Sequence, residues 1–244
     1  MKNNFALRHL VPTLLLSSFV GGVAGAQRDT PRALTGRFLG AAYLQVSEPR
    51  GDFGQNTGNG FGINASGLWR LDPAGLANVR VDAGFLVYGS NTRRIDFANT
   101  GGLVKLDLRT TSSIFSMVGG PQLGGTTGAI SPYVAALGGF SAFWTESSVE
   151  GSNNNVNNNQ AFASTTNSSD FALAYGMAGG LAIRFGSSRP VRLDLGARYL
   201  RHDEASYLND KRVEDGFRAN RDPTPLRGRA DFVTYYLGAS IVVY

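Results

Sequence analysis

Side chains that could act together as a hydrolytic site occur near residue 202. His202 is followed by Asp203, Glu204 and Ser206, and acyl-transfer enzymes activate a serine with a histidine and a carboxylate. Alternation along a strand would bring Ser206 and Glu204 to the side of His202 only if the strand extended that far. No motif spacing accompanies these residues, so we expect a protein without catalytic activity and keep an enzyme as an alternative.

Other kinds of reactive centre are absent from the composition. The chain has no cysteine, which excludes disulfides, thiolate nucleophiles, zinc–thiolate sites and an N-terminal lipid on cysteine. It has two histidines, and the scattered aspartates show no calcium-loop spacing. We therefore expect no cofactor and no metal. The formal net charge of +5 is a mild basic balance and gives no reason to expect nucleic acid as a partner.

Arginine and aspartate recur inside segments in which charged and apolar residues alternate. The charged rows predict a network within an enclosed space, formed by Arg80, Asp82, Lys105, Asp107, Arg109, Asp194 and Arg198. A second, basic group lies at one end of the segments: Arg37, Arg70, Arg184 and Arg192. Buried charges need partners or water, so the simplest interpretation is a plug of arginine–carboxylate pairs. The excess of positive charge leaves a narrow anion-selective pore as an alternative.

Eight segments of about ten or more residues carry these charges, and all show a period of two, which is typical of strands. Residues 171–185 are the clearest, with large apolar side chains at odd positions and Ala, Gly or Arg at even positions. In residues 104–114 we expect Leu106, Leu108 and Ile114 to face away from Lys105, Asp107 and Arg109. Residues 132–146 have two faces of similar polarity, so their register stays open.

The apolar rows could face a dry protein centre or a membrane, and three features favour the membrane. The polar rows carry arginine and aspartate in mid-strand, they are rich in Gly and Ala, and outward aromatic residues gather near the predicted strand ends. The expected aromatic girdles are Phe38, Trp69 and Phe185 at one rim and Phe61, Trp144, Phe171 and Tyr199 at the other. The fold class that follows is all-β: an eight-stranded antiparallel up-and-down transmembrane β-barrel.

The N-terminus has the organisation of an export signal. Lys2 and Arg8 precede an apolar stretch, and small residues end it at Ala26. We expect a signal peptide over 1–26 that is cleaved after Ala26, a periplasmic tail over 27–35 and a barrel domain over 36–244. The expected location is the bacterial outer membrane.

Connections between the segments differ in length. Inner turns are expected at 72–78 and 187–190, with a longer glycine-rich one near 120–131, and outer connections at 48–58, 90–101, 147–169 and 202–228. The connection 147–169 is rich in asparagine, and 202–228 mixes charges of both signs, so these two could contact an extracellular ligand or the phosphates of lipopolysaccharide. Arg50-Gly51-Asp52 matches the integrin-binding tripeptide, although Gly-Asp also forms simple turns.

From residue 36 to residue 244 the chain resembles the small eight-stranded outer-membrane barrels of the opacity-protein, attachment/invasion and OmpA-like type. The features that carry the resemblance are Pro132-Tyr133-Val134, the stretch Leu193-Asp194-Leu195-Gly196-Ala197-Arg198-Tyr199, and a strand that ends the chain. The resemblance implies a monomer in contact with outer-membrane lipid and lipopolysaccharide, whose barrel is an anchor and whose loops serve recognition or adhesion. Enzymes of such barrels modify lipid A, which gives the catalytic alternative at His202 its substrate class.

Overall fold

The structure, a computed structural model, describes residues 37–96, 105–151, 161–185, 191–208 and 224–243. The expected signal peptide and tail lie outside these residues, as do 97–104, 152–160 and 209–223 of the outer connections. Among the residues described, no helix is both long and apolar enough to cross a membrane.

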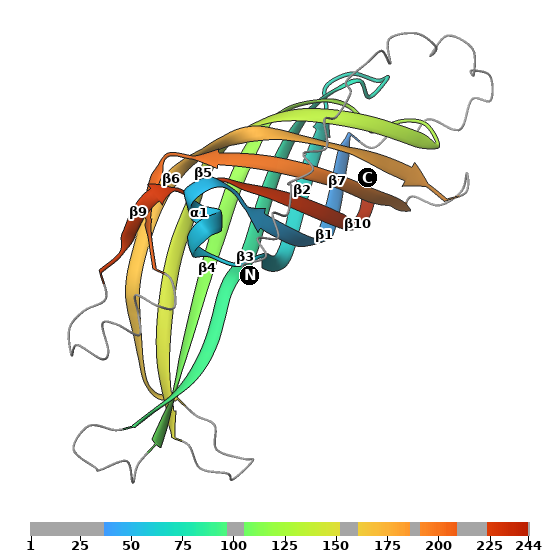
Figure 1. The fold of residues 1–244 in the computed structure, drawn as a ribbon. Coiled ribbons are helices and arrows are strands. Elements are labelled where there is room, and N and C mark those ends of the chain that lie inside the picture. Colours follow the sequence, from blue (N-terminus) through green and yellow to red (C-terminus); the bar gives the residue numbers. More distant parts are fainter. Residues whose placement is uncertain (1–36, 97–104, 152–160, 186–190, 209–223, 244) are drawn as a thin grey trace, which may run out of the picture. The chain divides into compact units, whose positions relative to one another are not determined.

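Eight antiparallel strands form a closed barrel in the order β1-β10-β7-β6-β5-β4-β3-β2 (Figure 1). Their bounds are β1 Phe38–Pro49, β2 Gly60–Arg70, β3 Ala77–Asp96, β4 Lys105–Gly124, β5 Ile130–Gly151, β6 Ala161–Arg184, β7 Val191–His202 and β10 Phe232–Val243. Each of these eight strands pairs with the barrel strand that follows it in the sequence. The first and last strands, β1 and β10, pair with each other and close the ring. The predicted fold class is confirmed.

The two ends of the barrel are built differently. The beginning of β1 and the end of β10 lie together, since Phe38 pairs with Val243. The β2–β3 and β4–β5 turns and the paired ends of β6 and β7, Arg184 with Arg192, are also at this end, called the inner end below. At the opposite, outer end, β3 to β6 continue past their neighbours: β2 pairs with β3 only as far as Val87, whereas β3 stays paired with β4 up to Asp96.

Apolar side chains face outward on the strands with clear alternation, as predicted. Leu173 is 61% exposed and Leu237 54% exposed, whereas the inward-facing Asp194 and Arg198 are buried. The open register of β5 is also settled, because Tyr133 faces inward and Val134 outward.

The expected facing of residues 104–114 is wrong at 109–114, the part of this segment whose side chains the structure describes. Ile114, predicted to face outward, is only 1% exposed and packs inside, together with the inward Thr110, Ser112 and Ser116 of the same strand. The cause is that the two rows of this segment are alike in polarity: one mixes Ile114 with threonine and serine, and the other mixes Arg109, Thr111 and Ser113 with Phe115 and Met117, so that polarity does not tell which way a row faces.

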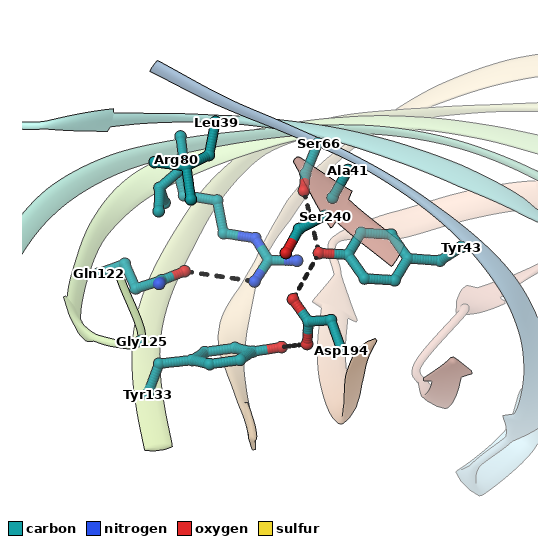
Figure 2. A pocket seen from close by; sticks show the side chains of 11 residues that line it. Leu39, Ala41, Tyr43, Ser66, Arg80, Gln122, Gly125, Tyr133, Asp194 and Ser240 are labelled. Carbon is teal, nitrogen blue, oxygen red and sulfur yellow. Dashed lines mark hydrogen bonds between the residues drawn. The ribbon is translucent and has the colours of Figure 1, made fainter. Parts of the chain in front are cut away.

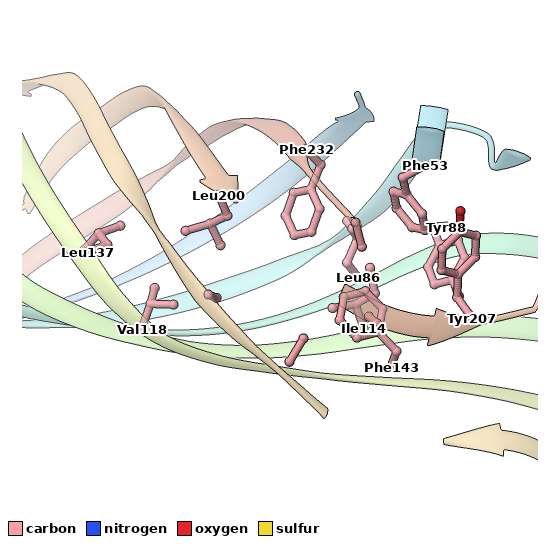
Figure 3. Packing of buried hydrophobic residues seen from close by; sticks show 14 of the residues in the cluster. Phe53, Leu86, Tyr88, Ile114, Val118, Leu137, Phe143, Leu200, Tyr207 and Phe232 are labelled. Carbon is pink, nitrogen blue, oxygen red and sulfur yellow. The ribbon is translucent and has the colours of Figure 1, made fainter. Parts of the chain in front are cut away.

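An apolar cluster fills the outer half of the interior (Figure 3). Its side chains come from the strands and from two outer elements, the short helix α1 (Gly51–Asn56) and a hairpin of β8 (Glu204–Tyr207) with β9 (Leu226–Arg229). Phe53 of α1 inserts among Tyr88, Phe143 and Tyr207, with ring centroids 5.3, 6.4 and 4.9 Å away. The outer elements therefore cover the outer end of the barrel with aromatic rings.

At the inner end, two turns are tied to each other. The hydroxyl of Thr126, in the β4–β5 turn, donates to the carbonyl of Gly75 in the β2–β3 turn at 2.6 Å, and Asn78 donates to the carbonyls of Gly75 and Gly124. In the β2–β3 turn, the backbone N–H of Ala77 donates to Asp72 at 2.6 Å, which lowers the pKa of this carboxyl group. These bonds give the β4–β5 turn a fixed place against the barrel.

The facing of β4 can be tested by substitution. We expect Ile114→Ala to reduce the free energy of unfolding by about 2–4 kcal/mol, because it leaves a cavity in a packed interior. Met117→Ala is the matched control on the outer face of the same strand, where the side chain is 44% exposed, and its effect should be smaller. The measurement is urea unfolding of the refolded protein in detergent. Equal losses for the two variants would contradict the inward position of Ile114.

Candidate functional site in the barrel interior

Arg80 lies in a cage of three tyrosine rings in the inner half of the barrel. Its guanidinium carbon is 5.9, 5.5 and 5.7 Å from the ring centroids of Tyr43, Tyr133 and Tyr236. These residues come from β1, β5 and β10, so the cage exists only because the ring of strands is closed. Arginine is attracted to the electron-rich face of an aromatic ring at such distances, and the attraction is larger away from water.

The tyrosine hydroxyls hold a carboxylate in place (Figure 2). Tyr43 and Tyr133 donate to the two oxygens of Asp194 at 2.9 and 2.7 Å. The hydroxyls of Tyr133 and Tyr236 are 3.0 Å apart. Ser66 donates in turn to the Tyr43 hydroxyl at 3.2 Å. A buried carboxylate with two hydroxyl donors is a satisfied group, which reduces the penalty of its burial.

Each tyrosine of the cage lies directly across from a glycine on a neighbouring strand. The pairs are Tyr43 with Gly238, Tyr133 with Gly180 and Tyr236 with Gly196. A Cβ atom on Gly180 would lie 2.6 Å from the Tyr133 hydroxyl oxygen. Only glycine leaves room for these rings beside the strand, and this is a physical reason for the many glycines in the inward rows.

Asp82 bridges two arginines. It accepts two bonds of 2.9 Å from the Nε of Arg80 and lies 3.7 Å from the Nη1 of Arg198. Arg80 also donates to Gln122 at 3.3 Å and Arg198 to Gln45 at 3.2 Å. All three charged side chains are at most 3% exposed. The structure thus brings together four of the expected network residues, Arg80, Asp82, Asp194 and Arg198.

The other expected members of this network are placed differently. Arg109 is exposed and faces outward, whereas its neighbour Thr110 is buried. The prediction that Arg109 belongs to the interior network is therefore wrong. This follows from the reversed facing of β4. The side chains of Lys105 and Asp107 lie outside the described part of the structure.

A small cavity of about 20 Å³ lies next to this network. It is bordered by Arg80, Tyr43, Tyr133, Asp194 and Gln122 among others (Figure 2). One water molecule needs at least about 10–15 Å³ measured in the same way. The cavity therefore has room for one or two water molecules and none for an organic solute.

At the inner end, two of the expected basic residues contact the β4–β5 turn. Arg70 donates to the carbonyl of Thr126 at 2.9 Å; Arg192 donates to the same carbonyl and to that of Gly125, the latter at 3.0 Å. Both side chains are buried, so they do not form an open basic mouth. Arg184 is partly buried beside Arg192, and Arg37 is exposed.

His202 is not assembled with the residues expected around it. Glu204 is exposed and pairs with Arg227 at 3.1 Å, and Ser206 donates its backbone N–H to Asp170. The His202 ring faces the interior instead, 1% exposed, with Nε2 2.8 Å from the hydroxyl of Ser141. It is packed between the rings of Phe143 and Phe232.

Within the described residues, the Nδ1 atom of His202 has no hydrogen-bond partner, so no carboxylate orients the ring as in a hydrolytic triad. The described residues also contain no group of three or more His, Asp or Glu side chains placed to hold a metal ion.

The aromatic residues expected to form girdles all lie on the outer face, near strand ends except for Trp144 and Phe171, because β5 and β6 continue past these two residues. Phe38, Trp69 and Phe185 are exposed at the inner end, and Phe61, Phe171 and Tyr199 are exposed toward the outer end. Trp144 is partly buried there and packs 5.8 Å from Phe85.

The Arg50-Gly51-Asp52 tripeptide forms the start of α1. All three residues are exposed, and Arg50 donates to Glu48 at 2.8 Å. Gly51 has φ of +58°, a conformation that favours glycine, so the helix start explains the Gly without a receptor.

Sequence reasoning missed the three tyrosines and Phe53. Alternation did place Tyr43 and Tyr236 on inward rows, between outward neighbours, which was the available signal. Tyr133 lies in the strand whose register stayed open. Phe53 is the only large apolar residue in the connection 48–58, which was the available signal for it.

No protein-family model matches the chain, and no curated protein matches it. Solved structures are similar to it at low sequence identity. Neisserial surface protein A has 12% identity and a TM-score of 0.43, over 84% of this chain and 97% of that one. Ail, the attachment invasion locus protein of Yersinia pestis, has 14% identity and a TM-score of 0.41, over 84% and 98%. A major outer membrane protein of Thermus thermophilus has 13% identity and a TM-score of 0.35, over 83% and 98%.

The bridge at Asp82 leads to a prediction of stability. Asp82→Asn leaves Arg80 and Arg198 buried beside each other without the carboxylate, and we expect a loss of about 3–5 kcal/mol in unfolding free energy. Asp203→Asn, at an exposed position, serves as control and should change it by less than about 0.5 kcal/mol. Urea unfolding of the refolded proteins measures both. A loss no larger than that of the control would contradict the role of Asp82.

Proposed function

We propose that this chain is an integral protein of the bacterial outer membrane, whose barrel is an anchor and whose outer elements present a surface for recognition or adhesion. The observation that carries the proposal is the belt of exposed apolar side chains around the closed barrel, including Leu44, Ile63, Leu173, Leu195 and Leu237. In water such a continuous belt would favour aggregation, whereas in a bilayer it faces acyl chains.

The height of the belt supports this location. On β2, Trp69 at one aromatic rim lies eight positions after Phe61 at the other. At about 3.3 Å per residue this is about 26 Å along the strand, and a tilt of about 40° reduces it to about 20 Å. Apolar bands of outer-membrane barrels are about 25 Å tall. The closed ring also pairs the backbone groups that hydrocarbon could not satisfy.

An anchor is favoured over a pore by the packing of the interior. The apolar cluster around Phe53 and Ile114 fills the outer half, the network around Arg80 the inner half, and the β4–β5 turn contacts Arg70 and Arg192 at the inner end. The cavity beside Arg80 holds at most a few water molecules. We propose that these layers close the barrel to solutes.

The outer end is proposed as the recognition surface because a helix, a hairpin and strand extensions are built there in addition to the barrel. Helix α1, the β8–β9 hairpin and the extensions of β3 to β6 lie there, and they carry exposed charges of both signs, such as Arg227, Glu204 and Arg109. The partners proposed are lipopolysaccharide and an extracellular ligand that contacts 147–169 and 202–228.

Membrane location can be tested by fractionation. We expect the exported protein to stay with outer membranes through washes in high salt and alkaline carbonate, to require detergent for extraction, and to change its gel mobility on heating. Recovery in the soluble fraction would contradict the proposal and favour a soluble carrier with a dry centre.

The lipid-facing position of Leu237 predicts a cost for charge. Leu237 pairs with Leu44 and Leu195 in the middle of the belt, and we expect Leu237→Arg to reduce the stability of the barrel in lipid vesicles by about 2–4 kcal/mol. Thr92→Arg, at an exposed position beyond the outer rim, is the control and should change it little. Equal effects would place the belt in water.

Display at the cell surface has its own test. An epitope inserted within 152–160 should bind antibody on intact cells, and the same epitope within 186–190 only after the outer membrane is permeabilised. The reverse pattern would show that the barrel is inserted the other way round.

A further inference from the structure

Positive charge is in excess in the inner half of the barrel. Among the described strand residues that face inward in this half, five arginines face two aspartates: Arg70, Arg80, Arg184, Arg192 and Arg198 against Asp82 and Asp194. Asp82 is shared by Arg80 and Arg198, and Asp194 is held by tyrosines. The excess therefore falls on the inner end, where it raises the free energy of a buried site unless an anion balances it.

Arg184 and Arg192 are the pair on which this excess is concentrated. They lie directly opposite each other on β6 and β7, so both side chains start from the same inward face with Cβ atoms about 5 Å apart. Like charges in this position repel and destabilise the sheet. In the described structure neither arginine has a carboxylate within 4 Å, and the Nε–H groups of both are buried without an acceptor.

The described contacts of Arg192 do not balance its positive charge, and they leave its Nε–H group without an acceptor. Two of its guanidinium nitrogens donate to the carbonyls of Gly125 and Thr126, which are neutral acceptors, and the side chain is 1% exposed. Gly124 and Gly125 have φ of +78° and +82°, and this conformation orients the turn toward the arginine. Arg184 makes no side-chain bond to the described residues and is only partly buried, so it is the member that an ion could reach from the inner end.

We propose that Arg184 and Arg192 form a binding site for an oxyanion of the phosphate class at the inner end of the barrel. A planar guanidinium presents paired N–H donors that match the oxygens of phosphate, and two guanidinium groups on one face can bind the same anion. The bound anion turns the repulsion between the arginines into attraction to a shared partner and supplies acceptors to the free Nε–H groups. The anion is either free phosphate or the phosphate of a lipid headgroup.

The test compares thermal unfolding of the refolded protein in a neutral detergent with sodium chloride and with sodium phosphate at equal ionic strength. At a phosphate concentration about 100 times its dissociation constant we expect the melting temperature to rise by about 5 °C. A second arm replaces the detergent with nanodiscs of phosphatidylcholine, with or without phosphatidylglycerol. A rise with free phosphate identifies a soluble anion, and a rise only with phosphatidylglycerol identifies a lipid headgroup.

Arg184→Gln is the decisive variant because Arg184 makes no side-chain bond to the described residues whose loss would prevent folding. We expect it to lose most of the response to the anion, while its melting temperature in chloride stays equal to or rises above that of the wild type. Arg227→Gln, in the exposed outer hairpin, is the matched control and should keep the full response. No response of the wild type in either arm, or an unchanged response of Arg184→Gln, would overturn the proposal. A melting temperature of Arg184→Gln lowered equally in chloride and phosphate would show a purely structural role and also overturn it.

Discussion

Closure of a sheet of only eight strands is the constraint on which the rest of the molecule depends. The ring satisfies the backbone hydrogen bonds without an edge, which frees the outer face to be apolar. It also makes the interior so narrow that side chains fill it. The space inside the ring therefore limits the size of the inward side chains as well as their polarity, and the small residues across from the large ones leave room for them.

The interior solves this packing problem in two layers with different chemistry. The outer layer is apolar and is completed by Phe53, a residue from a loop helix and not from the barrel. The inner layer buries charge, which is stable only when each charged group has partners. Arg80 has aromatic rings and Asp82, Asp194 has two tyrosine hydroxyls, and the tyrosines fit because glycines lie across from them. His202 belongs to the apolar layer, where a single contact with Ser141 satisfies one nitrogen.

Period-two alternation by itself predicted the eight barrel strands and, for most of them, the face that carries the exposed apolar side chains. It succeeds wherever one face is apolar and the other polar, as in residues 171–185. It failed for Ile114 and left Tyr133 open for the same reason, because the two rows of each of these strand segments are alike in polarity. The sequence also supplied the charged residues of the inner network, among them Arg80, Asp82 and Asp194.

Only the tertiary structure decided how these residues are joined. Tyrosine and glycine are paired by the register between strands, Arg192 and Thr126 are brought together over 66 positions of the chain, and Phe53 enters the barrel from a loop. Such contacts depend on closure and on the stagger of neighbouring strands, which are properties of the whole ring. A local pattern fixes which way a side chain points, and the geometry of the ring fixes what it meets there.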